Sequence, residues 1–330
     1  MTNLCRILSP LALALLVLAA PTGAAALSTN DVLAKLGFPA DTETKVAAGQ
    51  FVETGLTTAS DTDLNVGIAF LVKQSPETLT RALFDDMLLQ RVDPAVIAHG
   101  KLEGADATPD QLASLTLTPT QQKAYAAAAP GSALNLSPGE IAALTEAGKD
   151  PAAIASTVRT LLIMRYRAYR TNGLDGVASY ARENGLSNPR SDLVAVNQAA
   201  RTDAVLPPAF YDLLEGYPKK APADLTEVFN WSQFKAHGAD TIVLTHAFTG
   251  TFGNALVAVQ RQYYVSTGYN AEQAIAGFIP VDGGTLVVYT NHTSTDQVAG
   301  LGGGAKRRIG RKFMASQLEA LFKKVSAAAK

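Results

Sequence analysis

Residues 241–248 read Thr241-Ile-Val-Leu-Thr-His-Ala-Phe248, so that Ile242, Leu244, His246 and Phe248 fall at every second position. Successive residues of a strand point to opposite faces of a sheet, so this spacing predicts a strand with these four side chains on one face. Two more stretches rich in β-branched and aromatic residues follow, at 255–265 and 285–292, after glycine-containing turns. The C-terminal third therefore predicts an antiparallel sheet.

One long amphipathic helix is predicted after these strands. Its apolar residues fall on a single helical stripe, made of Ile309, Phe313, Met314, Leu318, Leu321, Phe322 and Val325. The basic side chains of residues 306–312 fall mostly off this stripe, which is typical of a solvated helix face; contact with an anionic lipid headgroup is the alternative. The predicted fold class is α+β, with a curved antiparallel sheet packed against this C-terminal helix.

A cluster of glycines, Gly300-Leu-Gly-Gly-Gly-Ala305, precedes the basic run. It matches G-x-G-x-x-A, but no crossover to a further parallel strand follows, which argues against a dinucleotide site. The favoured interpretation is a helix that begins near Thr295 and whose glycines allow a close approach to the sheet or a ligand. In the alternative, a glycine loop precedes a helix that begins at Ala305, and the free amides of that helix hold a phosphate or carboxylate.

The first 26 residues have the composition of a cleavable signal peptide. Arg6 provides the positive charge, residues 7–20 the apolar segment, and Ala24-Ala-Ala26 the cleavage site. We therefore expect a periplasmic or secreted protein with no transmembrane segment in the mature chain. Because Cys5 is the only cysteine, we expect neither disulfides nor thiolate chemistry after cleavage.

Net charge and length limit the class of protein further. The formal net charge is −1 and the sequence pI is about 6.4, so no overall field attracts nucleic acid.

Strands are predicted at 49–56 and 64–73, and Ser75-Pro76 begins a helix after the second strand. The expected organisation is a signal peptide (1–26), the first part of the sheet domain (27–92), a mostly helical insertion or subdomain (93–228), and the strands and helix that complete the sheet domain (229–330).

Few residues suggest catalysis or metal binding. His246 and His292 both lie in predicted strands and are the acid–base candidates. No metal-binding spacing such as H-E-x-x-H accompanies them, no G-x-S-x-G turn occurs, and no cofactor motif remains. We therefore predict no metal and no cofactor.

Two resemblances rest on particular stretches. Residues 64–84, a strand followed by Ser75-Pro-Glu-Thr78 and an amphipathic helix, resemble the opening of START-like helix-grip proteins, and residues 241–292 with the terminal helix resemble their closing half. This resemblance implies a cavity for a hydrophobic ligand between the sheet and the last helix. The stretches 165–173 and 230–234 are similar to uncharacterised exported bacterial proteins, which imply no activity.

Three functions stay open at this point. The leading one is an exported protein that binds or carries a hydrophobic, lipid-like molecule without catalysis. The second is an envelope enzyme that uses His246 and His292, and the third is a non-enzymatic interaction or assembly factor. The expected ligand-binding residues of the leading hypothesis are Val257, Val259, Tyr263, Val287, Tyr289, Gly303 and Phe313. Ligand identity and oligomeric state do not follow from the sequence.

Overall fold

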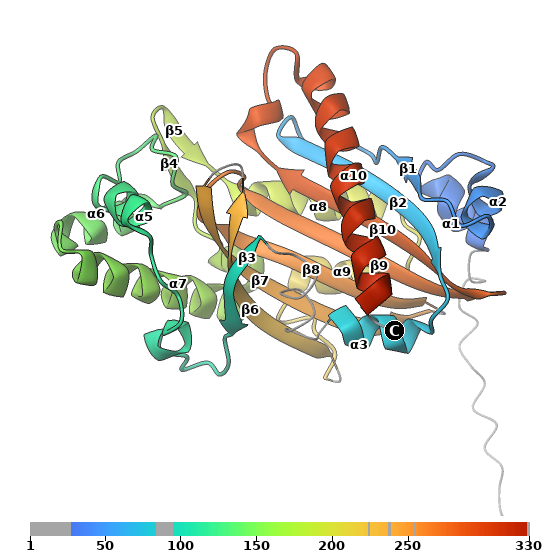
Figure 1. Cartoon of the computed structure of the whole chain (residues 1–330), viewed down its shortest axis with the longest axis horizontal. Helices are drawn as coiled ribbons and strands as arrows, with labels where there is room; N and C mark the ends of the chain where they lie inside the picture. The colour runs from blue at the N-terminus through green and yellow to red at the C-terminus, as the bar shows by residue number, and fades with distance from the viewer. Residues whose placement is uncertain (1–27, 84–94, 224, 237–238, 254, 329–330) are drawn as a thin grey trace, which may run out of the picture.

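The computed structural model describes residues 28–83, 95–223, 225–236, 239–253 and 255–328. Within these residues, eight strands form one curved antiparallel sheet in the order β1-β2-β10-β9-β8-β7-β6-β3, and β4 and β5 form a separate hairpin (Figure 1). The strands are β1 (Val52–Thr54), β2 (Asp63–Val72), β3 (Val96–Lys101), β4 (Tyr180–Arg182), β5 (Gly185–Ser187), β6 (Thr226–Ala236), β7 (Ala239–Phe252), β8 (Ala255–Val265), β9 (Ala271–Val281) and β10 (Gly284–Ser294). The α+β class predicted from the sequence is confirmed.

Two helices pack on one face of the sheet, α3 (Pro76–Leu83) and the long α10 (Gly303–Ala328) (Figure 1). The Phe51 ring stacks on Phe70 with centroids 4.7 Å apart, and Phe322 of α10 packs on Phe70 in a tilted arrangement with centroids 4.8 Å apart. We call the apolar side chains here the α10-face cluster; its buried members are Val66, Ile68, Phe70, Val72, Leu79, Ala258, Ala276, Phe278, Val287 and Ala315. The terminal helix is therefore held by burial of apolar surface.

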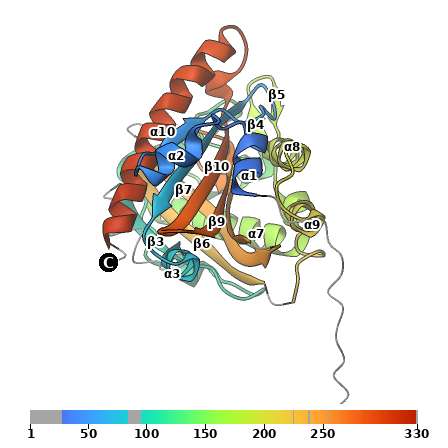
Figure 2. The same cartoon turned by 90° about the vertical axis from the view of Figure 1, so that its right-hand side faces the viewer.

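The remaining helices of the described residues lie on the other face of the sheet or beyond its β3 end. Figure 2 shows the sheet between α10 on one side and helices α8 and α9 on the other. They are α1 (Thr29–Lys35), α2 (Thr42–Ala47), α5 (Pro119–Ala126), α6 (Pro138–Ala147), α7 (Pro151–Asn172), α8 (Pro189–Thr202) and α9 (Pro208–Gly216), with short 3₁₀ turns η1 (Pro109–Leu112), η2 (Gly173–Gly176) and η3 (Asp296–Val298).

The longest helix of the middle region is α7, which Asp150 caps at its start. The Asp150 carboxylate accepts a hydrogen bond from the amide of Ala153 at 2.8 Å, Pro151 occupies the first turn, and Gly173 ends the helix with φ 58°. Buried aromatic side chains of α7, Tyr166 and Tyr169, pack against the sheet in the largest apolar cluster. The long helical region and β6–β8 thus share one core.

The middle region differs from the prediction in two places. Residues 96–101 form β3, which pairs with β6 at the edge of the sheet, and residues 180–182 form β4 within a stretch predicted as helix. Neither segment has the alternation of apolar residues that predicts a half-buried strand. Pairing with β6 and β5 supplies the backbone hydrogen bonds that define both.

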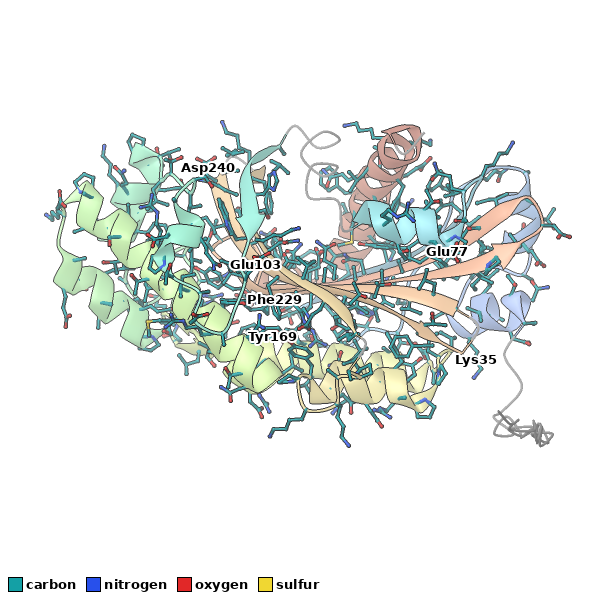
Figure 3. The ribbon with its side chains drawn as sticks, turned by 90° about the horizontal axis from the view of Figure 1, so that it is seen from below. Lys35, Glu77, Glu103, Tyr169, Phe229 and Asp240 are labelled. Atoms are coloured by element: carbon teal, nitrogen blue, oxygen red, sulfur yellow. The ribbon has the colours of Figure 1, made fainter. Side chains whose placement is uncertain are left out.

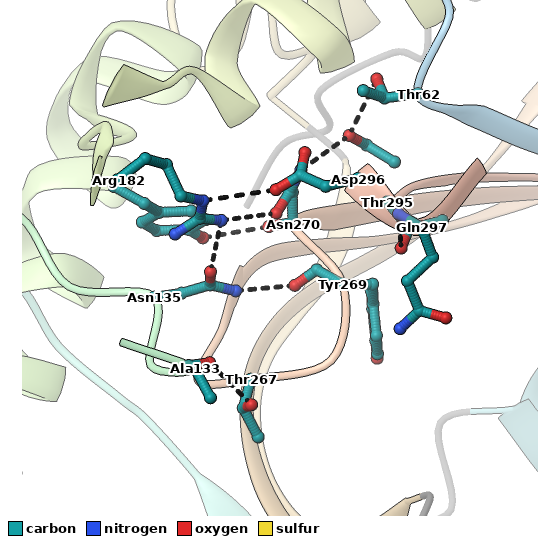
Figure 4. A network of polar contacts seen from close by, with 12 residues as sticks. Thr62, Ala133, Asn135, Arg182, Thr267, Tyr269, Asn270, Thr295, Asp296 and Gln297 are labelled. Carbon is teal, nitrogen blue, oxygen red and sulfur yellow. Dashed lines mark hydrogen bonds and ion pairs between the residues drawn. The ribbon is translucent and has the colours of Figure 1, made fainter. Parts of the chain in front are cut away.

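Polar side chains fasten this region to the sheet near the β8–β9 turn (Figure 4). Arg182 donates through Nη2 to Asn135 Oδ1 at 2.8 Å and to Asn270 Oδ1 at 2.9 Å, and its Nε lies 3.3 Å from Asp296 Oδ2. Asn135 also donates to the carbonyls of Val265 and Tyr269. One arginine therefore joins β4, the loop before α6, the β8–β9 turn and η3.

The start of α10 corrects the favoured interpretation of the glycine cluster. Gly300 and Gly302 have positive φ values of 71° and 77° and form a loop, and the helix begins at Gly303, not near Thr295. Left-handed backbone is accessible to glycine at little cost, which explains the residue type at these two positions.

The predicted apolar stripe of α10 is also only partly correct. Met314, Leu318 and Phe322 pack against the α10-face cluster, but Ile309 is 69% exposed and Phe313 is 56% exposed. Arg307 and Arg311 turn toward β2 instead, and donate to the carbonyl oxygens of Asp61 and Asn65 at 3.0 Å. Backbone acceptors at the edge of β2 attract the guanidinium groups, so the first turns of α10 present their apolar residues to solvent. The side chain of Val325 lies outside the described residues.

Candidate ligand-binding cavity

A cavity of about 770 Å³ lies between the sheet and helices α1, α8 and α9, on the face opposite α10. Its walls are mostly apolar. They include Val32, Leu36, Leu56, Val196, Ala199, Ala200, Ala204, Val205, Leu206, Pro207, Phe210, Tyr211, Phe252, Ala255, Ile275, Gly277, Ile279 and Val288. The polar members are Ser28, Thr29, Lys35, Thr57, Asp203, Gln273, Thr290 and His292.

The floor of the cavity is made by β9 and β10. Ile275 pairs with Thr290 and Gly277 pairs with Val288, so these side chains share one face of the sheet. Gly277 provides room above the floor: a Cβ added there comes within 4 Å of only the Val288 carbonyl oxygen, at 3.8 Å. The lack of a side chain at position 277 therefore contributes to the volume of the cavity.

The opposite wall comes from α1 and from the segment between α8 and α9. Val32 and Leu36 of α1 and Val205 and Leu206 of the connecting segment are only half-buried, because they border the cavity instead of filling it. Lys35 of α1, labelled in Figure 3, donates from Nζ to the carbonyl of Ala204 at 3.2 Å. This contact connects α1 to the segment between α8 and α9.

One end of the cavity is polar. His292 of β10 lines it, and its Nδ1 lies 3.1 Å from both carboxylate oxygens of Asp63. Burial raises the pKa of Asp63, but the hydrogen bond and charge of His292, with the amides of Ala59 and Asn65, outweigh it and lower this pKa overall. The ionised carboxylate holds the ring by Nδ1, which leaves Nε2 as the nitrogen available to a molecule in the cavity.

Gln273 lies beside His292 and connects the cavity to a fully buried arginine. The Oε1 atom of Gln273 accepts from Arg261 Nε at 2.8 Å, and its Nε2 donates to Asn197 Oδ1 at 2.9 Å. Arg261 also donates to the carbonyl of Leu214 at 2.8 Å and to the Tyr169 hydroxyl at 3.2 Å. No carboxylate of the described residues forms an ion pair with Arg261, so neutral acceptors satisfy its charge.

His246 continues this network away from the cavity. It is fully buried, and burial, reinforced by the charge of Arg261, lowers its pKa, so the ring is neutral at pH 7. The Tyr169 hydroxyl donates to its Nδ1 at 3.1 Å, and its Nε2 donates to the carboxylate of Glu227 at 3.0 Å. A chain of hydrogen bonds thus runs from the guanidinium of Arg261 to a carboxylate at the surface. Figure 3 shows Tyr169 of α7 and Phe229 of β6 close together at this interface, and the His246 ring stacks on Phe229 with centroids 4.4 Å apart.

The two histidines do not form a joint site. Cross-strand pairing places His246, Arg261, Gln273 and His292 in one row on β7, β8, β9 and β10. Three strand spacings separate the histidines, a distance of about 14 Å. His246 packs among aromatic rings and does not line the cavity, so only His292 is placed to touch a bound molecule. The described residues contain no group of three or more His, Cys, Asp or Glu side chains that could hold a metal ion.

The seven predicted ligand-binding residues lie in separate parts of the structure. Val257, Val259 and Tyr263 belong to the core beneath α7, and Tyr263 stacks on Tyr169 with centroids 4.0 Å apart. Val287 and Tyr289 face α10 on the other side of the sheet. Gly303 is buried at the start of α10 and Phe313 is exposed. None of the seven lines the 770 Å³ cavity.

The sequence indicated some of the walls and missed others. Helices α1 and α8 begin after the side-chain caps Ser28 and Asn188, and such cap residues are a helix-start signal in the sequence. The strand that forms half of the floor, β9, was missed because alanine and glycine are common in it and β-branched residues are few. The position of the helices over the sheet depends on long-range packing, which local patterns do not encode.

Comparison with protein-family models, curated proteins and solved structures finds no match for this chain. Among the described residues, no helix combines the length and hydropathy needed to cross a membrane. The case for a function therefore depends on the cavity itself.

Proposed function

We propose that this protein binds or carries a hydrophobic, lipid-like molecule in the cavity between β9–β10 and helices α1, α8 and α9. The observation that carries the proposal is the cavity of about 770 Å³ with mostly apolar walls. This volume falls within the range of about 300–1,000 Å³ that small-molecule sites occupy, and apolar walls with a few polar groups are typical of such sites.

The polar end of the cavity suits the headgroup of an amphiphilic ligand. The acyl or isoprenoid part of the molecule lies along Ile275, Gly277 and Ile279, where burial of apolar surface drives binding. A hydroxyl or carboxylate at its end takes a hydrogen bond with His292 Nε2, whose ring Asp63 holds in place. Binding of this kind requires no bond-making chemistry.

The proposal also includes export of this protein and its resemblance to helix-grip proteins. The composition of residues 1–26 supports delivery to the periplasm or beyond the cell, and those residues lie outside the described part of the chain. The succession of β2, α3, the strands β6 to β10 and the final α10 supports the resemblance to START-like proteins. The proposed ligand lies on the sheet face opposite α10, because the α10-face cluster occupies the space that the resemblance assigns to it.

Filling the cavity tests the proposal. In Gly277→Leu the new side chain projects from the floor into the cavity, which loses volume, whereas the added Cβ of Gly277→Ala makes only one contact, at 3.8 Å, and leaves most of the volume. Organic extracts of natively purified wild type and Gly277→Ala are expected to contain one lipid-like compound at a stoichiometric ratio by mass spectrometry. The Gly277→Leu variant is expected to lack it while keeping the wild-type circular dichroism spectrum.

A surface glycine provides the matched control. Gly139 in α6 is exposed, and a Cβ added there contacts nothing within 4 Å, so Gly139→Leu adds the same side chain away from the cavity. Protein freed of endogenous compounds by organic extraction and refolding is then titrated with a fluorescent fatty acid. The absence of an extracted compound together with equal probe binding by wild type and Gly277→Leu would reject the proposal.

A further inference from the structure

The first four turns of α10 carry an exposed apolar surface within a strongly basic segment. Ile309 is 69% exposed and Phe313 is 56% exposed, and Leu301 in the preceding loop is fully exposed. Burying large apolar side chains is normally favourable, so exposed apolar residues gathered on a helix and the loop before it mark a surface that something else covers.

The arrangement around these residues follows from helix geometry. At about 100° per residue, Ile309 and Phe313 lie about 40° apart on the helix surface, and Lys306 and Lys312 lie about 60° to either side of Ile309. Leu318, which packs against the α10-face cluster, lies about 180° from Ile309. The apolar pair therefore points directly away from the sheet and is flanked by lysines on both sides.

The charge of this segment is unbalanced. Between Asp296 and Glu319 the chain has five Lys and Arg residues and no Asp or Glu, although the whole chain has a formal net charge of −1. Arg307 and Arg311 are used in hydrogen bonds to backbone carbonyls of the segment 61–65. Lys306, Arg308 and Lys312 are exposed, and in the described part of the structure none of these three side chains makes an ion pair. Their charge is available to an anionic partner.

We propose that this face of α10 docks on the surface of an anionic lipid bilayer. An apolar centre flanked by lysines is the pattern of helices that lie in the interface plane, where apolar side chains enter the headgroup boundary and cations contact lipid phosphates. An acidic protein surface would match the same charge, and the vesicle assay below distinguishes it from a bilayer. The inference goes beyond the proposed ligand site, because the cavity opens on the opposite face of the sheet.

Sedimentation with lipid vesicles tests this inference on the full chain. Wild type is expected to bind vesicles of mixed phosphatidylglycerol and phosphatidylcholine, to bind phosphatidylcholine vesicles weakly, and to dissociate as salt is raised. The triple variant Lys306→Gln, Arg308→Gln, Lys312→Gln is expected to lower the partition coefficient on the order of 100-fold, since each cation near an anionic surface contributes about 1 kcal/mol. The double variant Ile309→Ser, Phe313→Ser is expected to bind weakly even at low salt.

Matched controls separate this surface from general effects. Leu186 of β5 is 62% exposed and lies away from α10, so Leu186→Ser removes comparable apolar surface elsewhere and is expected to bind like wild type. The Gly277→Leu variant is also expected to bind vesicles normally, which keeps the failure of the ligand proposal distinct from failure of this one. Equal binding to both vesicle types, or a dimer in light scattering that Ile309→Ser, Phe313→Ser dissociates, would overturn the inference.

Discussion

The Nδ1 atom of His292 lies 3.1 Å from both carboxylate oxygens of Asp63, although the two residues are 229 positions apart in the chain. The antiparallel pairing of β2 with β10 brings them together, because Asp63 begins β2 and pairs with Ser294. Asp63 also accepts hydrogen bonds from the Ala59 amide and the Asn65 side chain, both at 2.9 Å. A buried carboxylate with three donors fixes the one histidine that borders the cavity.

Replacing Asp63 with asparagine is expected to destabilise the fold and to weaken ligand binding. The neutral amide cannot accept all three hydrogen bonds, and a loss of about 1–3 kcal/mol in the free energy of unfolding follows from unpaired buried donors. Urea unfolding at pH 7 measures the first effect, and the affinity for a fluorescent fatty acid measures the second. Unchanged affinity in a folded Asp63→Asn variant would contradict the role given to His292.

The same pair also predicts a pH dependence. The pKa of Asp63 is lowered in the folded protein from its usual value of 3.8, so its ionised form stabilises the fold. That contribution is fully present above about pH 5, where the carboxylate is ionised in both states, and is lost as pH falls below 3.8 through the lowered folded value. Urea midpoints between pH 6 and pH 3 should fall less steeply in Asp63→Asn than in wild type.

Arg261 offers a second test, because its guanidinium is buried without a carboxylate partner among the described residues. We expect Arg261→Lys to lose about 2–4 kcal/mol of unfolding free energy, since a single ammonium group cannot reach Gln273, Tyr169 and the Leu214 carbonyl together. Combining it with Tyr169→Phe should give less than the sum of the two single effects, because both changes break the same network. Additive effects in this double-mutant cycle would show that the two groups act independently.

His246 should make stability sensitive to mild acid. Its pKa is lowered below 6.5 in the folded protein, so the unfolded chain binds a proton first as pH falls. The stabilisation is present above about pH 6.5 and is lost between pH 6.5 and the lower folded value. Urea unfolding between pH 7.5 and pH 5 should show this slope in wild type and a flatter one in His246→Gln.

Much of the sheet was predictable because its longest strands alternate. Residues 241–248, 255–265 and 285–292 lie within β7, β8 and β10, and 64–73 overlaps β2. Ile242 and Phe248 are buried on one face together with His246, as their spacing indicates. Apolar residues at every second position can be recognised locally in the sequence, and they show which face of a strand is buried in the folded protein.

The 770 Å³ cavity lies on the sheet face opposite the one predicted to hold the ligand, and the reason is physical. Predicting that α10 covers the ligand required knowing which side of the sheet each helix joins, and local periodicity does not contain that information. Local periodicity also did not predict which residues of the first turns of α10 are buried. Ile309 and Phe313 have core-like spacing, yet the backbone acceptors near Asn65 draw Arg311 inward and turn the apolar pair outward.

Arg182 joins the middle region to the sheet through the contacts in Figure 4, and its removal should loosen that attachment. In Arg182→Ala the side-chain oxygens of Asn135 and Asn270 lose their 2.8 and 2.9 Å donors while both residues stay buried. A loss of about 2 kcal/mol in unfolding free energy is expected, with part of the cost offset by water that enters the space left by the side chain. Amide hydrogen exchange should also quicken at Asn135, whose N–H bonds to the Ser266 carbonyl.

The matched control for this variant is Arg190→Ala. Arg190 pairs with Asp175 at 2.6 Å, but both side chains are exposed, so removing that pair is expected to change the unfolding free energy by less than about 1 kcal/mol. If Arg182→Ala and Arg190→Ala changed stability equally, the buried acceptors at Asn135 and Asn270 would not depend on Arg182. A larger loss in Arg182→Ala, together with faster exchange confined to residues 133–135 and 180–187, would show that this arginine fastens the helical region to the β8–β9 turn.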